Sequence, residues 1–338
     1  MKEETLKKSS RHRAGRPAFA CATASSSSWK DYGWAVDPLI ITSGDSAAEL
    51  LRRGGLGDVI GWKDSPAVGP SPRLDAAPYK ALRAQYRGVN DVAAFQDLDT
   101  LPAADHVVLL VDACPYDTGI LVRLIDYLHP RVKRMRVRVV DAHPSVPRFH
   151  GLGQLSPGDL AALPPGAHDV TPDEVALSVR TWDALCDDKP MNLVGLLHDD
   201  THALPHLAAA LRRILQELPW TQDGLSRLER AALAAVAGGA VTTTELVTAV
   251  RDQEEPVHGL WCGDGHLLNI VSELCTAKPP LMLGPAVPLA LTAEGRDVLA
   301  GRAMAQPSVE RWVGGTRILP GPTWRWDDVA SDVALGLT

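Results

Sequence analysis

The chain has 338 residues, of which 45% are hydrophobic and 22% charged, and its formal net charge is -7 at pH 7. This length suffices for two or more domains, and the composition is typical of a soluble globular protein. The negative charge argues against a protein that binds duplex nucleic acid or an anionic membrane over a broad surface, and no apolar run approaches the roughly 20 residues that span a bilayer.

Residues 1–35 are basic at first and then rich in serine, which predicts a disordered tail. Translation from an upstream start codon would give the same pattern. The small-residue stretch 18–24 is too short for the hydrophobic region of a signal peptide. The five cysteines, at positions 21, 114, 186, 262 and 275, form no C-x-x-C pair. This spacing favours a reduced interior, so we expect a cytoplasmic protein.

Residues 36–148 have the pattern of an α/β domain with a mostly parallel, Rossmann-like sheet. The first predicted strand, 38–42, precedes Gly44, Asp45 and Ser46 and then a helix that ends near residue 54. Gly44 and the first N–H groups of that helix could bind an anion. The ordinary alternative is that Asp45 or Ser46 is a plain N-cap.

Three further strands are predicted in this domain. Residues 58–62 form one, followed by Asp64, a proline-rich loop and a polar helix over 76–86. The central strand, 107–111, is an unbroken apolar run, and apolar residues at helical spacing follow it up to residue 128. The last strand, 135–140, carries arginines at 136 and 138, which indicates one wet face, as on a sheet edge.

Acidic residues follow all four predicted strands. Parallel strands end at the same edge of a sheet, and ligands of open α/β sheets bind beyond that edge. We therefore expect Asp45, Asp64 and Asp112 to lie in one shallow cleft. This cleft could bind a small molecule or a phosphate-containing ligand through the following residues: Gly44, Asp45, Ser46, Asp64 and Asp112.

Two other roles are open to these acids. Asp64, Asp112 and Asp141 could bind a hard cation. Asp112, Asp117 and His143 could act as general acid and base. The ordinary alternative is that acids after strands cap the turns and helices that follow. The sequence identifies no cofactor.

Residues 149–222 are predicted to form an all-α connector. Thr171 and Pro172 have the pattern of a strong helix start, with the helix running to residue 185. His198, His202 and His206 recur every four residues, which resembles a metal-binding stripe. Pro205 interrupts that helix, so three surface histidines near a helix start are the ordinary interpretation.

Residues 223–305 have the element order of a winged-helix domain, and residues 306–338 form a tail rich in tryptophan and arginine. The stretch 262–275, which contains the third helix, has neither lysine nor arginine, and this composition is poor for neutralising phosphates. The tail could stack on bases, but such tails more often pack back on their own domain with arginine lying on tryptophan.

Many short blocks between residues 39 and 327 resemble the bacterial family known as domain of unknown function 1835. They include Ser43–Ser46, Trp62–Asp64, Gly69–Pro70, Phe149–Leu155, Gly224–Ser226 and Trp324–Asp327. That family has no established activity to carry over. Its central strand usually ends Glu-His-Asp, where this chain has Asp112, Ala113 and Cys114, and Val68 replaces an acid. The resemblance therefore implies either altered specificity or a non-catalytic relative. Cys114 could act as a nucleophile with His143 as its base.

Three classes of function follow from these patterns. The favoured class is an α/β protein that binds a small molecule at its strand ends, with enzymatic activity left open. The second is a winged-helix regulator whose α/β domain senses a ligand. The third is a non-catalytic interaction protein with a degenerate site.

Overall fold

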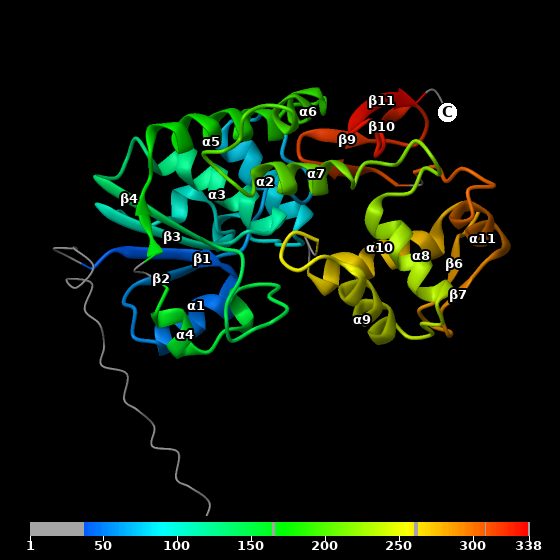
Figure 1. Cartoon of the computed structure of the whole chain (residues 1–338). Coiled ribbons are helices and arrows are strands. Elements are labelled where there is room, and N and C mark those ends of the chain that lie inside the picture. Colours follow the sequence, from blue (N-terminus) through cyan, green and yellow to red (C-terminus); the bar gives the residue numbers. More distant parts are fainter. Residues whose placement is uncertain (1–36, 164–165, 260–262, 308, 337–338) are drawn as a thin grey trace, which may run out of the picture.

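The computed structural model describes residues 37–163, 166–259, 263–307 and 309–336 (Figure 1). The tail predicted for residues 1–35 lies outside the described residues. The described part of the chain contains an α/β layer structure and a set of C-terminal helices that lie side by side (Figure 1). None of the described helices is long and apolar enough to cross a membrane.

A five-stranded sheet in the order β2-β1-β3-β4-β5 forms the centre of the α/β part. The first four strands are mutually parallel, and the short β5 is antiparallel to β4. This confirms the predicted mostly parallel sheet. The strands are β1 (Leu39–Ser43), β2 (Val59–Trp62), β3 (His106–Asp112), β4 (Arg134–Val140) and β5 (His168–Asp169).

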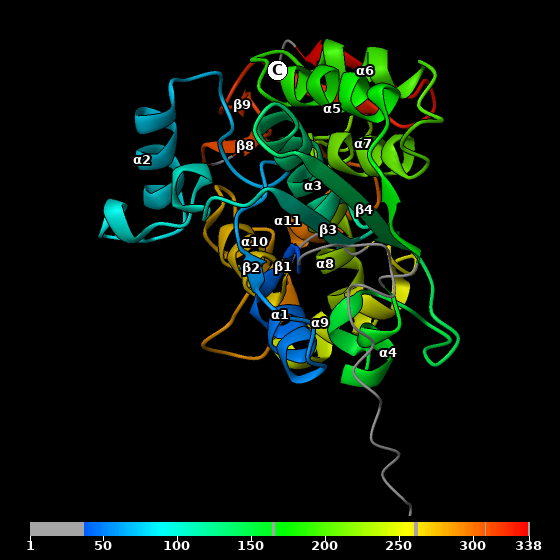
Figure 2. The ribbon, with the colours of Figure 1, turned by 90° about the vertical axis from the view of Figure 1, so that its left-hand side faces the viewer.

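The apolar run of β3 is buried because helices cover both faces of the sheet (Figure 2). On one face, α1 (Gly44–Arg53), η4 (Leu152–Gln154) and α4 (Pro157–Ala161) share a core with Val108 and Leu110. On the other face, the covering helices are α3 (Pro115–Leu128), α5 (Pro172–Leu185), α6 (Met191–Leu197) and α7 (Leu207–Leu215).

The strand order places a topological switch between β1 and β3. From β1 the chain crosses to β2 on one side, and it then returns to β3 on the other side of β1. Open α/β sheets bind ligands at such points, outside the carboxyl ends of the strands. We therefore expect a ligand-binding site at the loops after β1, β2 and β3.

Between β2 and β3 the chain leaves the sheet and forms α2 (Ala76–Tyr86), η2 (Val92–Ala94) and η3 (Leu98–Thr100). Helix α2 stands at the side of the sheet (Figure 2). Its Arg83 side chain is 1% exposed and points back into the protein, which explains how a helix of polar composition is fixed in place.

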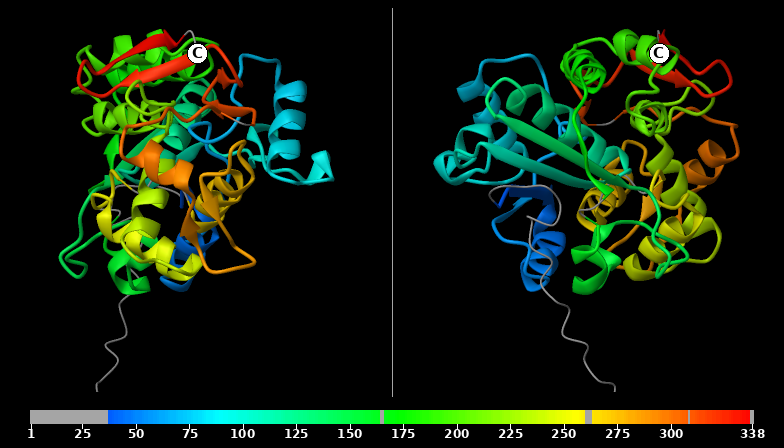
Figure 3. Two further views of the ribbon diagram at one scale, coloured as in Figure 1. Left: turned by 90° about the vertical axis from the view of Figure 1, so that its right-hand side faces the viewer. Right: turned by 60° about the vertical axis from the view of Figure 1, so that its left-hand side comes forward.

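The C-terminal part contains three helices, a short hairpin and a closing helix, in the predicted order (Figure 3). Ser226 and Thr242 cap the first two helices, each with a glutamate three residues later that completes a capping box. The elements are α8 (Arg227–Ala237), α9 (Thr243–Gln253), α10 (Asp264–Thr276), β6 (Met282–Leu283), β7 (Ala290–Leu291) and α11 (Ala293–Leu299).

Two hairpins complete the described chain: β8 (Arg311–Val313) with β9 (Thr316–Ile318), and β10 (Thr323–Asp327) with β11 (Asp332–Gly336). The Trp326 side chain is fully buried, and its backbone pairs with Pro219 and Thr221. Arg212 lies 6.0 Å from the centre of the Trp326 ring, and Arg230 lies 4.5 Å from that of Trp220. The aromatic tail thus packs back on the preceding helices.

Candidate functional site

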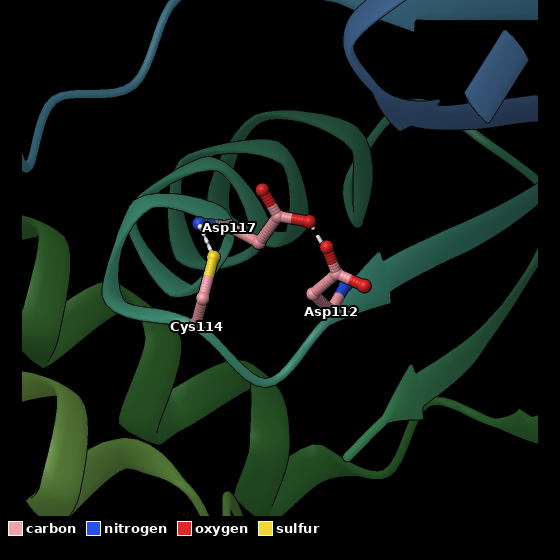
Figure 4. A group of neighbouring side chains, drawn as sticks. All are labelled: Asp112, Cys114 and Asp117. Carbon is pink, nitrogen blue, oxygen red and sulfur yellow. Dashed lines mark hydrogen bonds between the residues drawn. The ribbon is translucent and has the colours of Figure 1, made fainter. Parts of the chain in front are cut away.

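The end of the central strand turns sharply into α3 and brings the ionisable side chains of Asp112, Cys114 and Asp117 together (Figure 4). Strand β3 ends at Asp112, and Cys114 is the N-cap residue of α3. The Cys114 sulfur accepts the backbone N–H of Asp117 at 3.3 Å. The Asp117 carboxylate in turn accepts the backbone N–H of Asp112 at 2.8 Å, so the helix start folds back onto the strand end.

The other side of Asp112 faces the segment after β4. Its Oδ1 accepts the backbone N–H of Leu152 at 2.8 Å. Gly151 packs so closely that a Cβ at this position would lie 2.5 Å from Asp112 Oδ2. The contact requires glycine, because a larger residue would displace the carboxylate or the loop.

Both carboxyls have raised pKa values, and burial is the largest cause for each. Burial raises the pKa of Asp117 to about 6, although hydrogen bonds from Ser43 and Asp112 oppose that rise. Burial and the neighbouring Asp117 raise the pKa of Asp112 well above its usual range. The pair therefore retains a proton at a pH where an exposed aspartate has lost it.

Asp112, Cys114 and Asp117 are also the one group of three candidate metal-ligating side chains in the described part of the chain, with ligand atoms within 4.8 Å of one another. Burial and the two carboxylates raise the pKa of the Cys114 thiol well above its ordinary value. A thiol in this environment stays protonated and is a poor nucleophile. The ring of His143 contacts Ser145 at 2.8 Å, and no contact joins it to Cys114 among the described residues.

The acids after the other strands have separate partners. Asp64 is 2% exposed and forms a buried ion pair with Arg83, whose Nε lies 2.9 Å from Asp64 Oδ2. Asp45 is largely exposed and pairs with Lys63 at 2.8 Å. Asp141 is exposed and lies 3.9 Å from His206. The structure thus brings Asp112 and Asp117 together, and it does not gather Asp45, Asp64 and Asp141 with them.

The residues after β1 also differ from the expectation. Helix α1 begins at Gly44, which has a φ of 73°, and Ser43 occupies the N-cap position without a side-chain hydrogen bond. The prediction that Asp45 or Ser46 caps this helix is therefore wrong. The reason is that glycine adopts the left-handed region readily, so the turn is made one residue earlier than the acid suggests.

A cleft of about 1120 Å³ lies between the α/β part and the C-terminal helices. The loop after β2 contributes Val68, Gly69 and Pro70, and the start of α3 contributes Cys114 and Tyr116. The opposite wall comes from α10 and β8. Its polar and aromatic members are His266, Asn269, Glu273, Arg311 and Trp312.

Asp45, Asp64 and Asp112 are not among the residues that line this cleft. Asp64 acts on the cleft indirectly. Arg83, held by Asp64, donates to the carbonyl groups of Ser65, Val68 and Pro70 at 2.7–3.0 Å. The buried ion pair thereby fixes the loop that forms one wall.

Several cleft residues have unusual electrostatic surroundings. Burial and the nearby guanidinium groups of Arg311, Arg87 and Arg213 lower the pKa of His266 to about 4, so its ring is neutral at physiological pH. Burial raises the pKa of Tyr116 to about 12, and its hydroxyl donates to the Lys63 carbonyl at 2.6 Å. Neither residue was singled out from the sequence as a site residue.

His150 is a further lining residue that sequence reasoning missed as a site residue, although it lies within the Phe149–Leu155 block. Its Nε2 accepts an N–H from Arg148 at 3.2 Å. Its Nδ1 is buried and has no hydrogen-bond partner among the described residues. A neutral ring with Nε2 as acceptor carries its hydrogen on Nδ1, so this N–H lies inside the protein and the cleft is lined by the rest of the ring.

The three histidines of the predicted metal stripe have different surroundings. His198 bonds the carbonyl of Ser331, His202 pairs with Asp200, and His206 is the N-cap residue of α7. The stripe is broken because the helix starts after Pro205.

The chain matches no model of a known protein family, and a search among curated proteins also found no match.

Proposed function

We propose that this protein binds a small polar molecule in the cleft between its parallel sheet and its C-terminal helices. The observation that carries the proposal is the position of the cleft. It is lined by the residues that follow β2 and β3, at the edge where open α/β sheets bind ligands. Clefts between structural units at this edge are common ligand sites.

The lining suits a ligand with a flat apolar part and an anionic part, such as a phosphate-containing compound. Tyr86, Tyr116 and Trp312 offer aromatic surface. Arg87 is exposed at the cleft, and its guanidinium donates to the Lys63 carbonyl at 3.4 Å, a weak contact that a ligand anion would readily replace.

Binding is better supported than catalysis. Cys114 and Tyr116 line the cleft, whereas Asp112 and Asp117 do not. The hydrogen bonds of Asp117 with Asp112 and Cys114 hold the strand-to-helix turn that carries the two lining residues. We assign Asp112 and Asp117 a positioning role. On the sequence blocks described above, we also propose membership of the domain of unknown function 1835 family. In this proposal the residues at 112–114 diverge from the family's Glu-His-Asp pattern, and the site retains ligand binding.

A thermal-shift screen against nucleotides, sugar phosphates and amino acids tests the proposal. A ligand that binds the folded state raises Tm by mass action, by an amount that grows with concentration. The Arg87→Ala variant should lose most of that rise for an anionic compound. The control is Arg53→Ala, because Arg53 is an exposed arginine on α1 that pairs with Glu49. Equal shifts in both variants would exclude Arg87 from the site.

A winged-helix regulator is the second candidate function, because α8, α9 and α10 are followed by the β6–β7 hairpin. In such domains the third helix enters the major groove. Here His266, Asn269 and Glu273 of α10 line the cleft and face the α/β part. We therefore propose that this module closes the ligand site and does not bind duplex DNA. A gel shift that weakens steeply with salt would favour the regulator instead.

A further inference from the structure

A second cluster of ionisable side chains lies where three segments meet, apart from the residues that line the cleft. His206 is the N-cap residue of α7, and His258 lies in the turn after α9. Asp141 follows the last residue of β4. The side chain of His206 is 25% exposed and that of Asp141 58% exposed, so solutes can reach the junction from one side.

The two imidazole rings face each other through nitrogen atoms. Nδ1 of His206 lies 3.2 Å from Nε2 of His258. The ring centres are 5.3 Å apart, and the ring planes are inclined at 33°. The second nitrogen of His206, Nε2, lies 3.9 Å from Oδ2 of Asp141. A carboxylate at this position favours the hydrogen on Nε2, which leaves the Nδ1 lone pair directed at His258.

The turn that carries His258 is strained. Val257 has a φ of 55° and is 4% exposed, and the N–H of His258 donates to the Pro256 carbonyl at 2.6 Å. A β-branched residue in this left-handed region is rare, because its side chain crowds the backbone. The surrounding packing thus holds His258 against His206 at a conformational cost.

We propose that His206 and His258 bind a divalent transition-metal ion such as Zn²⁺, and that Asp141 orients the His206 ring. Two nitrogens bound to a tetrahedral zinc ion lie roughly 3.3 Å apart. The observed separation of 3.2 Å, at which the two nitrogens share a hydrogen bond, is close to this value, so the ion would take the place of the shared hydrogen. Carboxylates commonly accept the second N–H of a metal-binding histidine. Asp141 lies 3.9 Å from Nε2 of His206, so a small movement of this exposed side chain would form that hydrogen bond.

The proposed ion would join the turn after α9 to the start of α7. Since α7 packs on α3, the ion would fasten the C-terminal helices to the α/β part. Two protein ligands leave other coordination positions to water, so the affinity should be weaker than that of a four-ligand structural site. The proposal is independent of the ligand assigned to the cleft.

The test is calorimetric titration of the full chain, first stripped with a chelator, with Zn²⁺ near neutral pH, together with thermal shift. The wild type should bind one Zn²⁺ and show a raised Tm. His258→Ala should weaken binding at least tenfold, and Asp141→Asn by about tenfold to a hundredfold. The control is His202→Ala, because His202 also pairs with an aspartate, Asp200, at 2.7 Å. This variant should bind as the wild type does.

Equal Zn²⁺ affinities for the wild type and His258→Ala would overturn the proposal, as would the absence of binding by the wild type. If His258→Ala does not fold, His206→Gln and Cu²⁺ binding to the wild type keep the test decisive. The paramagnetic resonance spectrum of the copper-loaded wild type should show coupling to imidazole nitrogens. A spectrum without nitrogen coupling would contradict the assigned ligands.

Discussion

The Asp117 carboxylate accepts the backbone N–H of Asp112 at 2.8 Å, across the turn between the central strand and its helix. The Asp117 side chain is 2% exposed, and it also accepts a hydrogen bond from Ser43 at the end of β1. One carboxylate therefore joins the ends of the two strands that flank the topological switch. This relationship holds Asp117 beside Asp112, where its charge contributes to the raised pKa of Asp112.

Replacing Asp117 with alanine should destabilise the protein. The substitution leaves the Asp112 N–H without its acceptor in a buried place, which costs about 1–3 kcal/mol. Urea unfolding followed by circular dichroism measures the change. Asp117→Asn keeps an oxygen acceptor and should lose less. Equal stability of Asp117→Ala and the wild type would show that water replaces the carboxylate.

The carboxyl pair should make stability fall as pH rises. The folded pKa of Asp117 is about 6, raised from 3.8, and that of Asp112 is raised in the same direction. When the pH lies between the unfolded and the folded pKa of a carboxyl, the folded state binds more protons than the unfolded state. The free energy of unfolding therefore decreases as the pH rises through this range. Asp112→Asn should remove part of this loss. Relative to the wild type, the variant should gain stability at neutral pH and gain little near pH 4.

Comparison of unfolding free energies of the two proteins across this pH range provides the measurement. The control is Asp45→Asn, because Asp45 pairs with Lys63 on the surface. Asp45→Asn removes no buried carboxyl, so it should not gain stability at neutral pH. A loss of several kcal/mol in Asp112→Asn at neutral pH would instead mark Asp112 as an ionised structural acid.

Gly151 should tolerate no side chain, whereas Gly153, two residues later, should tolerate one. A Cβ at Gly151 would meet Asp112 Oδ2 at 2.5 Å, but the nearest atom to a Cβ at Gly153 lies 3.9 Å away. Gly151→Ala should cost about 1–3 kcal/mol through overpacking. Gly153→Ala should leave the stability nearly unchanged. Equal unfolding midpoints for the two variants would contradict the close contact.

Arg83→Ala should destabilise the protein more than any surface ion-pair change. It leaves the buried Asp64 without its main partner, a change that typically costs about 3–5 kcal/mol. It also frees the three carbonyl groups that Arg83 holds in the loop after β2. Lys63→Ala, which breaks the exposed pair with Asp45, is the control and should cost less than about 1 kcal/mol.

Cys114 should react slowly with iodoacetamide in the folded protein. The residue is 8% exposed, and the pKa of its thiol is raised by burial and by two acids, so little thiolate forms. Peptide mass spectrometry after labelling measures each cysteine separately. Cys275, which is less buried, should be labelled faster. Rapid labelling of Cys114 would instead support the hypothesis that Cys114 acts as a nucleophile.

Local patterns were sufficient to predict most elements. The apolar run at 107–111 became the buried strand β3, and Thr171 with Pro172 begins α5 as expected. Such features depend on a few adjacent residues and on the 3.6- and 2-residue periods. Local patterns could not predict that Asp64 and Asp112 have different surroundings, because each of them follows a strand in the same manner.

What distinguishes these two acids is a distant partner. Arg83 lies 19 residues after Asp64, on a helix whose composition gives no sign of a buried arginine. The sequence could not predict the cleft either, because its walls come from the loop after β2, the start of α3 and α10. No local pattern indicates that His266 and Cys114 line the same space, since about 150 residues separate them.

A crystal structure of the protein with the compound that raises Tm most in the thermal-shift screen would locate the bound ligand. We expect ligand density between Tyr116 on α3 and His266 on α10, with an anionic group beside Arg87. Density at the exposed pair of Asp45 and Lys63, or at the outer surface of the C-terminal helices, would contradict the assignment of the cleft as the binding site.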